Sequence, residues 1–343
     1  MNVSTYQIKK IVKPPSLLIL VAGFEDRSRG ILDSLKETDL SDTETVLLTY
    51  IQQDKTINEL NEKNKIKIEN FLIKRVKTLT NVSLNHLDPF ETIKSLRLIF
   101  KHFSEHVLKD IMFDVSACID GLIPILILDL ISYKPHSLSI FYTRPEFYHL
   151  EKIYLDNDLE LEEKLDLESR RRYLMTSGLS RVDYFEGFEG LPNPLLQNLL
   201  IFSVGFEINK VDAICSRFED TKKIILYGRS DMFNSNRAEK ISREIHKELR
   251  QVIQFEEGII ENFDVQKTVQ SLSSILAKYK NYNVLLCSFA TKPQIIANTL
   301  IALKHPEVAL MRVILKNYEP RLFSYGTKEK LLISIENLEE FDL

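Results

Sequence analysis

The sequence predicts an α/β fold: two tandem Rossmann-like domains with mainly parallel sheets, related by internal duplication. Its 343 residues fit two domains of roughly 100–200 residues each. Short apolar runs alternate with helical patterns, which is typical of parallel βαβ units. The same motifs also occur twice in the same order. We therefore expect a first Rossmann-like domain over 1–150, a charged helical connector over 151–194 and a second Rossmann-like domain over 195–343.

The repeat consists of four matched segments. Gly23-Phe24-Glu25 follows an apolar run, as does Gly205-Phe206-Glu207 in the second half. The remaining pairs, in chain order, are 91–96 with 267–272, 113–116 with 285–288, and Thr143-Arg144-Pro145 with Tyr318-Glu319-Pro320. Four matches in one order favour duplication of a single ancestral unit.

In the first half, fully apolar runs indicate strands buried on both faces of a sheet. The expected strands are 17–22, 45–51, 111–115 and 138–142, and the expected helices are 26–35, 58–76, one beginning at Asp88-Pro89, and 122–132. Asp88 is a favoured N-cap residue, and proline is tolerated at the first helical position.

The second half repeats this alternation of strands and helices. The expected strands are 199–204, 223–227, 284–286 and 309–315, and the expected helices are 210–218, 237–249, 265–279 and 294–304. Segment 331–336 fits an additional edge strand of the second domain. Between the halves, 156–172 is acidic and then basic and fits a solvated connecting helix, in which the Arg170-Arg171-Arg172 run favours a solvated face over a phosphate site.

Composition limits the class of protein. A net charge of -4 argues against a general nucleic-acid-coating role, which would favour a basic surface. The three cysteines are too few and too scattered for a disulfide scaffold, so we expect buried, reduced thiols. The apolar run 121–128 is far shorter than the ~20 residues of a membrane span, and 1–15 lacks a signal-peptide core. These features predict a cytoplasmic protein with no membrane association.

The turn after the first strand is the first candidate ligand site. Ligands of open parallel sheets bind beyond the carboxyl ends of the strands. Gly23 allows close backbone approach there, Arg27 supplies positive charge for an anion, and Glu25 can hold a hydroxyl or orient the arginine. A tight turn with surface charges is the alternative. The second copy keeps Gly205 and Glu207 but has no basic residue equivalent to Arg27, so the first domain is the better candidate for an anion.

Asp114 and Ser116 end another predicted buried strand. Asp114 fits a general base, a metal ligand or a partner for Arg27 or Arg144, and it fits equally well a structural carboxylate that caps the following turn. In the second copy Leu286 takes the place of Asp114, while Ser288 keeps the hydroxyl of Ser116.

Ser288, Thr291 and Lys292 form a polar cluster between a strand and a helix. Hydroxyls and a lysine at a helix start suit phosphate binding, and an N-cap at Thr291 beside an exposed lysine is the alternative with equal weight. Ser230, Asp231 and Asn234 follow a neighbouring strand and are candidates for the same rim.

Aromatic residues accompany the last repeated turn in each half. Phe147 and Tyr148 follow Arg144, and Phe323 follows Pro320. Such rings can stack on a base, but they more often pack against the neighbouring domain.

One further motif resembles a metal site. His102-Phe103-Ser104-Glu105-His106 has the H-x-x-E-H spacing of inverted zinc peptidases, but it falls at a predicted helix end without a convincing third ligand. We therefore expect exposed surface histidines and no metal.

The strand-end loops, and Ala290-Thr291-Lys292-Pro293 in particular, resemble the CRISPR-associated Rossmann-like (CARF-like) sensor domains. That family binds cyclic oligonucleotides and often carries a threonine-lysine turn before a helix. The resemblance implies a nucleotide ligand and a regulatory role in prokaryotic antiviral defence. The chain departs from the pattern at Phe289-Ala290, where the family has glycines.

Three functions follow as hypotheses. The first is a nucleotide-sensing or regulatory module. The second is an interaction subunit with degenerate pockets, which acts through a protein partner or as a homo-oligomer. The third is an enzyme on nucleotides or phosphoesters that uses Asp114 and Glu25. The sequence identifies neither a catalytic residue nor a cofactor.

Overall fold

The computed structural model describes residues 2–51, 54–85, 89–149, 151, 176–319 and 323–338. The chain forms two compact units. The first comprises Met1–Glu146 and Ser324–Leu343, and the second comprises Phe147–Phe323. The predicted N-cap Asp88 and the predicted connecting helix with its arginine run lie outside the described residues.

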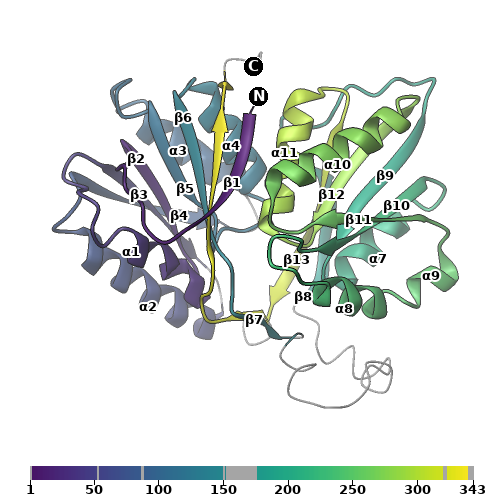
Figure 1. Ribbon diagram of the computed structural model, residues 1–343, viewed down its shortest axis with the longest axis horizontal. Coiled ribbons are helices and arrows are strands. Elements are labelled where there is room, and N and C mark those ends of the chain that lie inside the picture. The colour runs from purple at the N-terminus through teal and green to yellow at the C-terminus, as the bar shows by residue number, and fades with distance from the viewer. Residues whose placement is uncertain are drawn as a thin grey trace. The chain divides into compact units, whose positions relative to one another are not determined.

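The first unit is built on a sheet that is seven strands wide within the described residues, in the order β1-β15-β6-β5-β2-β3-β4. The strands are β1 (Asn2–Ile8), β2 (Leu17–Ala22), β3 (Glu44–Ile51), β4 (Thr78–Asn85), β5 (Asp110–Asp114), β6 (Ser137–Thr143) and β15 (Lys330–Glu336). Strands β2 to β6 are parallel to one another, β15 is antiparallel to β6, and β1 is antiparallel to β15. Figure 1 shows β15, in yellow, between β1 and β6.

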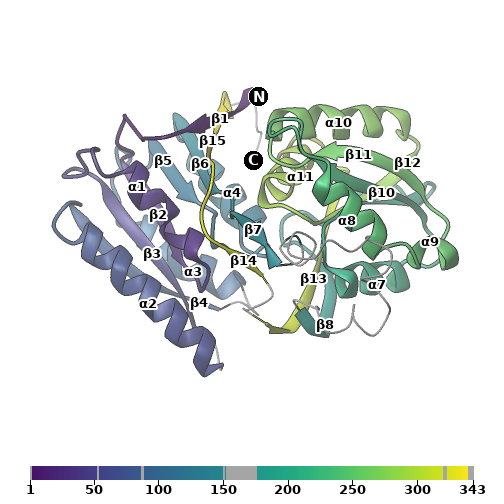
Figure 2. The same ribbon diagram turned by 60° about the horizontal axis from the view of Figure 1, so that its bottom comes forward.

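The helices of this unit are the 3-10 turn η1 (Asp26–Arg29), α1 (Gly30–Ser34), α2 (Lys55–Leu72), α3 (Pro89–Phe100) and α4 (Ile123–Ser132). Helix α2 begins where the Asp54 side chain accepts a hydrogen bond from the Ile57 amide at 2.9 Å. Its apolar residues Ile68 and Leu72 pack with Ile31 of α1 and with Leu18 and Leu20 of β2 in one buried cluster. Helices α1 and α2 therefore cover the same face of the sheet (Figure 2).

The second unit has a sheet of six strands in the described part of the chain, in the order β11-β10-β9-β12-β13-β8. The strands are β8 (Thr176–Tyr184), β9 (Gln197–Val204), β10 (Lys222–Arg229), β11 (Glu256–Glu261), β12 (Tyr282–Phe289) and β13 (Ala309–Tyr318). Strands β9 to β13 are parallel, and β8 is antiparallel to β13. The short strands β7 (Phe147–Tyr148) and β14 (Ser324–Tyr325) lie where the chain passes between units.

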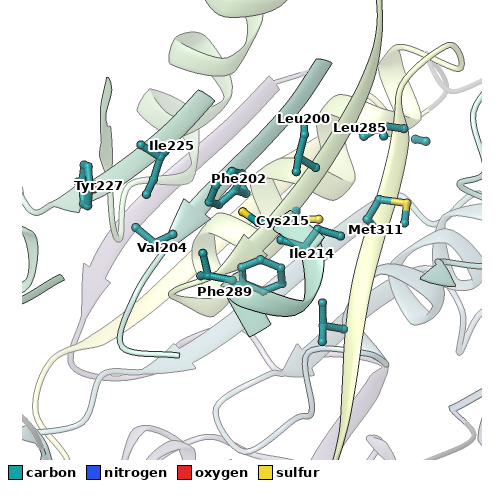
Figure 3. Close-up of a cluster of buried hydrophobic side chains, with 14 of the residues drawn as sticks. Leu200, Phe202, Val204, Ile214, Cys215, Ile225, Tyr227, Leu285, Phe289 and Met311 are labelled. Carbon is teal, nitrogen blue, oxygen red and sulfur yellow. The ribbon is translucent and has the colours of Figure 1, made fainter. Parts of the chain in front are cut away.

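Helices α7 (Ile208–Arg217), α8 (Arg237–Ile245), α9 (Leu249–Val252), α10 (Val265–Lys278) and α11 (Lys292–Lys304) complete the second unit. Its core contains Phe202 and Val204 of β9, Phe289 of β12, and Ile214 and Cys215 of α7 (Figure 3). Among the described residues, none of the helices combines the length and apolar character that a bilayer span requires.

The two sheets share one topology, which confirms the predicted fold class. In chain order, the parallel strands of each unit are arranged third-second-first-fourth-fifth: β4-β3-β2-β5-β6 in the first and β11-β10-β9-β12-β13 in the second. In both units an antiparallel strand lies beside the fifth strand. The repeated sequence motifs therefore mark equivalent places in two copies of one arrangement.

The predicted domain boundaries differ from the structure in two places. Segment 331–336, expected as an edge strand of the second domain, is part of β15 and lies inside the first unit's sheet. It can do so because Leu331, Ile333 and Ile335 are all buried there. Strand β8 falls within the predicted connector but belongs to the second sheet. The connector therefore cannot extend to residue 194.

Strands β1, β4, β8 and β11 were missed by the sequence analysis, and all four lie at the ends of the two sheets. An edge strand has a neighbour on one side alone, so it needs fewer apolar residues than a central strand. In β4, for example, Val82 and Leu84 are buried, while most of the other residues are exposed or partly exposed. Such a strand has no continuous apolar run to identify it.

The cysteines provide a direct test of the core. Cys118, Cys215 and Cys287 are buried, reduced thiols, as predicted. Burial raises the pKa of Cys215 to about 11 and raises the pKa of Cys287 well above its usual value. Because the thiolate is the reactive form, we expect almost no labelling by a thiol reagent of the native protein at pH 8. Mass spectrometry after denaturation should show three labels per chain, and fast native labelling of Cys215 or Cys287 would contradict this packing.

Candidate functional site

The turn after β2 packs against the loop that follows β5. A Cβ atom added to Gly23 would lie 2.9 Å from Ala117 Cβ and 3.2 Å from the Ala117 carbonyl oxygen. A side chain at position 23 would therefore push the two segments apart. The Gly23 carbonyl accepts hydrogen bonds from Asn64 Nδ2 at 2.7 Å and from Ser28 Oγ at 3.3 Å. Glycine thus brings together the ends of the first and fourth strands of the repeat.

Glu25 and Arg27 form a buried ion pair beside this turn. Glu25 Oε2 accepts hydrogen bonds from Arg27 Nε at 3.1 Å and from Nη2 at 2.8 Å. Arg27 Nη1 also donates to the Tyr142 hydroxyl at 3.3 Å, and the Ser324 hydroxyl donates to Glu25 Oε1. Arg27 is 5% exposed and Glu25 is 8% exposed. Both side chains are therefore buried, unlike the surface charges of the alternative, and Glu25 contacts the arginine directly.

Asp114 and Ser116 are joined by their own hydrogen bonds. Asp114 Oδ1 accepts from the Ser116 amide at 2.8 Å and from Ser116 Oγ at 2.5 Å, and Ser116 Oγ accepts from the Thr143 amide at 2.8 Å. The carboxylate thus caps the turn after β5 and links it to the end of β6. This geometry is the structural alternative that the sequence left open for Asp114.

Arg144, which the sequence analysis considered as a partner of Asp114, pairs with Glu329. Its Nε lies 3.1 Å from Glu329 Oε2, and its amide donates to the Glu329 carbonyl at 2.9 Å. These contacts hold the start of β15 beside the end of β6. In the first unit, Arg27 contacts Tyr142, and the neighbouring Thr143 amide donates to Ser116, which contacts Asp114. These contacts connect the Gly23 turn to Asp114, while Arg144 pairs with Glu329.

Strand register changes one equivalence in the repeat. Ile19 pairs with Phe113 in the first unit, and the matching Ile201 pairs with Leu286 in the second. Asp114 therefore corresponds to Cys287, one residue beyond the Leu286 assigned from sequence. Cys287 lies in the core on the α7 side of its sheet. The second copy still lacks a carboxylate at this position, so the charge difference between the copies remains.

The second unit has an equivalent glycine turn with different partners. Gly205 donates its amide to the Phe289 carbonyl at 3.1 Å, and an added Cβ would lie 2.9 Å from that oxygen. The Gly205 carbonyl accepts from Ser242 Oγ at 3.0 Å and lies 3.2 Å from His246 Nε2. Here Ser242 of α8 and His246, directly after that helix, make the contacts with the glycine carbonyl that Asn64 of α2 makes in the first unit.

Two further predicted residues of the second unit lie near this turn. Glu207 Oε1 lies 4.0 Å from Lys210 Nζ, a long ion pair on one turn of α7. Ser288 Oγ accepts a hydrogen bond from Ser203 Oγ at 2.9 Å, which joins β12 to β9. Phe206, between Gly205 and Glu207, packs edge-on against Tyr148 with ring centroids 5.8 Å apart. Both rings belong to the second unit, so the predicted packing against the neighbouring domain stays a prediction.

Thr291 is the N-cap of α11 and takes part in a capping box with Gln294. Its hydroxyl donates to the Asn262 carbonyl at 2.5 Å, while Gln294 Nε2 donates to the Glu261 carbonyl at 3.0 Å. The N-cap alternative is thus confirmed, but the lysine beside it is not exposed: Lys292 is 8% exposed. Sequence analysis missed Gln294 and Asn262, because only the fold brings the end of β11 to the start of α11.

The loop after β10 meets the same rim through Glu261. The Asp231 amide donates to Glu261 Oε2 at 2.7 Å, and the Phe263 amide donates to Oε1 at 3.1 Å. Ser230 and Asn234 shape this loop: Ser230 bridges to Ser235, and Asn234 has a φ of 47°. Burial raises the pKa of Glu261 despite these hydrogen bonds. The predicted proximity of 230–234 to Thr291 is therefore achieved through β11, which the sequence analysis did not identify.

The described residues contain no group of three or more histidine, cysteine, aspartate and glutamate side chains that could hold a metal ion. His102 and His106 follow the end of α3 and are exposed, as predicted.

No protein-family model matches the sequence, and no curated protein matches it either. One solved structure, a periplasmic ribose ABC transporter from Conexibacter woesei, aligns with 77% of this chain and 69% of its own length at 10% identity. The TM-score of that alignment is 0.25, which supports no inference about ligand or function.

Proposed function

We propose that this chain is a nucleotide-sensing regulatory module, and that the nucleotide binds to the first unit at the carboxyl ends of β2 and β5. The close packing of the Gly23 turn on Ala117 carries this proposal. It lies between the first and fourth strands, where the strand order reverses and where open α/β sheets bind their ligands. The buried arginine of the adjacent ion pair supplies guanidinium charge next to this position.

The contacts of the charged groups favour binding over catalysis. Asp114 Oδ1 accepts two hydrogen bonds from Ser116, and Glu25 Oε2 accepts two from Arg27. Carboxylates held in this way fix the shape of the surrounding loops. A rigid, preformed loop binds a ligand with a smaller loss of conformational entropy than a mobile one.

The first unit is a better candidate than the second. The threonine-lysine turn that resembles the CARF-like domains uses its hydroxyl to contact Asn262 and to cap α11. The same resemblance implies a role in antiviral defence. The proposal includes this role, in which the module would bind a nucleotide signal.

A nucleotide panel tests the proposal. Mononucleotides, cyclic dinucleotides and cyclic oligonucleotides are titrated into the full chain by calorimetry, with parallel thermal denaturation. A ligand at 100 times its Kd should stabilise the unit that binds it by about 2.7 kcal/mol. Absence of binding heat together with a flat melting temperature across the panel would refute nucleotide sensing.

Gly23→Ala locates the site. Its methyl group should separate the two turns and weaken nucleotide binding, because the nearest atom is only 2.9 Å away. Gly258→Ala is the matched control, since its added Cβ would meet only the end of the flexible Leu226 side chain. The double variant Gly23→Ala/Ala117→Gly should recover part of the lost affinity. Unchanged binding in folded Gly23→Ala would exclude this turn as the site.

A further inference from the structure

Strand β4 forms one end of the first unit's sheet and pairs with β3 on one side. Its eight residues include no charged residue, proline or glycine, and they pair in unbroken register with 44–51 of β3. Its exposed residues are Thr78, Asn81, Ser83 and Asn85. Proteins usually protect an edge strand with charges, proline or a bulge, because its backbone can otherwise pair with a strand of another chain. Strand β4 has none of these three protections.

The equivalent strand of the second unit is protected by charge. Strand β11 occupies the same place in its own sheet, at the end and beside the second parallel strand. It contains Gly258 and carries the carboxylates of Glu256, Glu257 and Glu261. Two copies of this edge brought together would place six carboxylates at one contact, which like-charge repulsion opposes. The two repeats therefore differ here: charge opposes self-pairing of β11 but not of β4.

Two exposed isoleucines lie next to the β4 edge. Ile66 and Ile73 of α2 are 46% and 66% exposed. Glu69 lies on the side of the helix that faces β4, because its Oε1 accepts a hydrogen bond from Asn81 Nδ2 at 2.9 Å. At about 100° per residue, both isoleucines lie within about 60° of Glu69 around the helix, on the side away from the buried Ile68. A strand added to β4 would therefore lie beside this apolar flank of α2.

An antiparallel pair of β4 strands about a two-fold axis at Asn81 uses both features. Asn81 then lies opposite its own copy, and Leu79 of the second copy lies opposite Ser83. Leu79 is partly buried and packs on the same side of the sheet as α2. Ile66 directly follows Lys65, which lines the same surface hollow as Ser83. Leu79 of the second copy therefore lies beside Ile66, and the symmetry makes this contact twice.

We propose that two copies of this chain form a symmetric dimer in which their β4 strands pair and the sheets of their first units become continuous. A second copy fits this edge because its β4 is already an ordered, uncharged strand and because it brings Leu79 to the exposed Ile66. Two-fold contacts of this kind are the commonest way in which identical chains associate. The dimer does not depend on the proposed nucleotide site, since no residue of the Gly23 turn takes part in it.

Sedimentation equilibrium of the full chain, without added ligand, tests the dimer. We expect a mass twice that of one chain, which falls to the monomer mass on dilution. Ile66→Glu should weaken the dimer about a hundredfold, about tenfold for each of the two isoleucines. Leu98→Glu is the matched control, because Leu98 is a 61% exposed residue of helix α3 in the same unit, and it should change the dissociation constant less than about twofold. A chain that stays monomeric at high micromolar concentration, or a dimer that folded Ile66→Glu leaves unchanged, would overturn the proposal.

Cysteine cross-linking tests the strand pairing itself. The native cysteines are buried, so one introduced thiol per chain is available for oxidation. Asn81→Cys places that thiol on the two-fold axis and should give a disulfide-linked dimer under mild oxidation. Thr78→Cys is the matched control on the same strand, because its two copies would lie about 20 Å apart, too far for a disulfide bond. Equal cross-linking of both variants, or cross-linking of neither in a dimeric chain, would show that the copies meet elsewhere.

Discussion

Replacing Arg27 with methionine should destabilise the first unit by about 3–5 kcal/mol. The substitution removes the positive charge that compensates Glu25, and it leaves that carboxylate 8% exposed beside an apolar side chain. A buried charge that has lost its opposite charge is far more costly than a broken pair at the surface. We expect urea denaturation followed by circular dichroism to show a lower midpoint for the transition of this unit.

The chain offers a matched exposed pair. Lys10 Nζ lies 3.3 Å from Glu37 Oε2, with both side chains largely in solvent. Lys10→Met should therefore change the free energy of unfolding by less than about 1 kcal/mol. The double variant Glu25→Gln/Arg27→Met should recover part of the stability lost by Arg27→Met, because neither charge remains. If Arg27→Met lowers the free energy of unfolding no more than Lys10→Met does, the Glu25–Arg27 pair does not stabilise the unit as its burial implies.

Replacing Asn61 with leucine should instead raise the free energy of unfolding of the ligand-free protein by about 1–2 kcal/mol. Leucine has the same branched shape as asparagine, although its two methyl groups are larger, and it removes two buried polar atoms that have no partner. For a unit of this size, that gain corresponds to a rise in melting temperature of roughly 2–8 °C.

Asn64→Leu is the matched comparison. It makes the same change on the same face of α2, but it removes the donor that holds the carbonyls of Gly23 and Glu25. We expect a loss of about 1–3 kcal/mol. Thermal denaturation of both variants without added ligand separates the two roles. An equal loss of stability in both would mean that Asn61 supports the fold as Asn64 does.

The central strands could be predicted from sequence because each is buried on both faces. Strand β2 begins and ends at Leu17 and Ala22, as the apolar run predicts, and all six of its residues are buried. The ends of the sheets could not be found in this way. β1, β4, β8 and β11 carry polar residues along much of their length and become strands because a neighbour supplies hydrogen bonds.

The candidate site was predicted in part. The glycines at positions 23 and 205 lie at close backbone contacts, as expected from a turn at a strand end. The roles of the polar residues differed more from the prediction. Asp114 contacts Ser116, two residues away, and Thr291 caps its own helix; both contacts are local and were foreseen as alternatives. Asn61 gave no signal in the sequence, because an asparagine in a polar helix is unremarkable until its burial is known.

The sequence by itself determined the alternation of strands and helices and the existence of two copies, since apolar periodicity and repeated motifs are local properties of the chain. Tertiary structure alone decided which distant residues meet. Ser324 donates to Glu25 across 299 positions of sequence, and β15 inserts between β1 and β6. Such contacts depend on the packing of whole elements, and no periodicity within either segment specifies the partner.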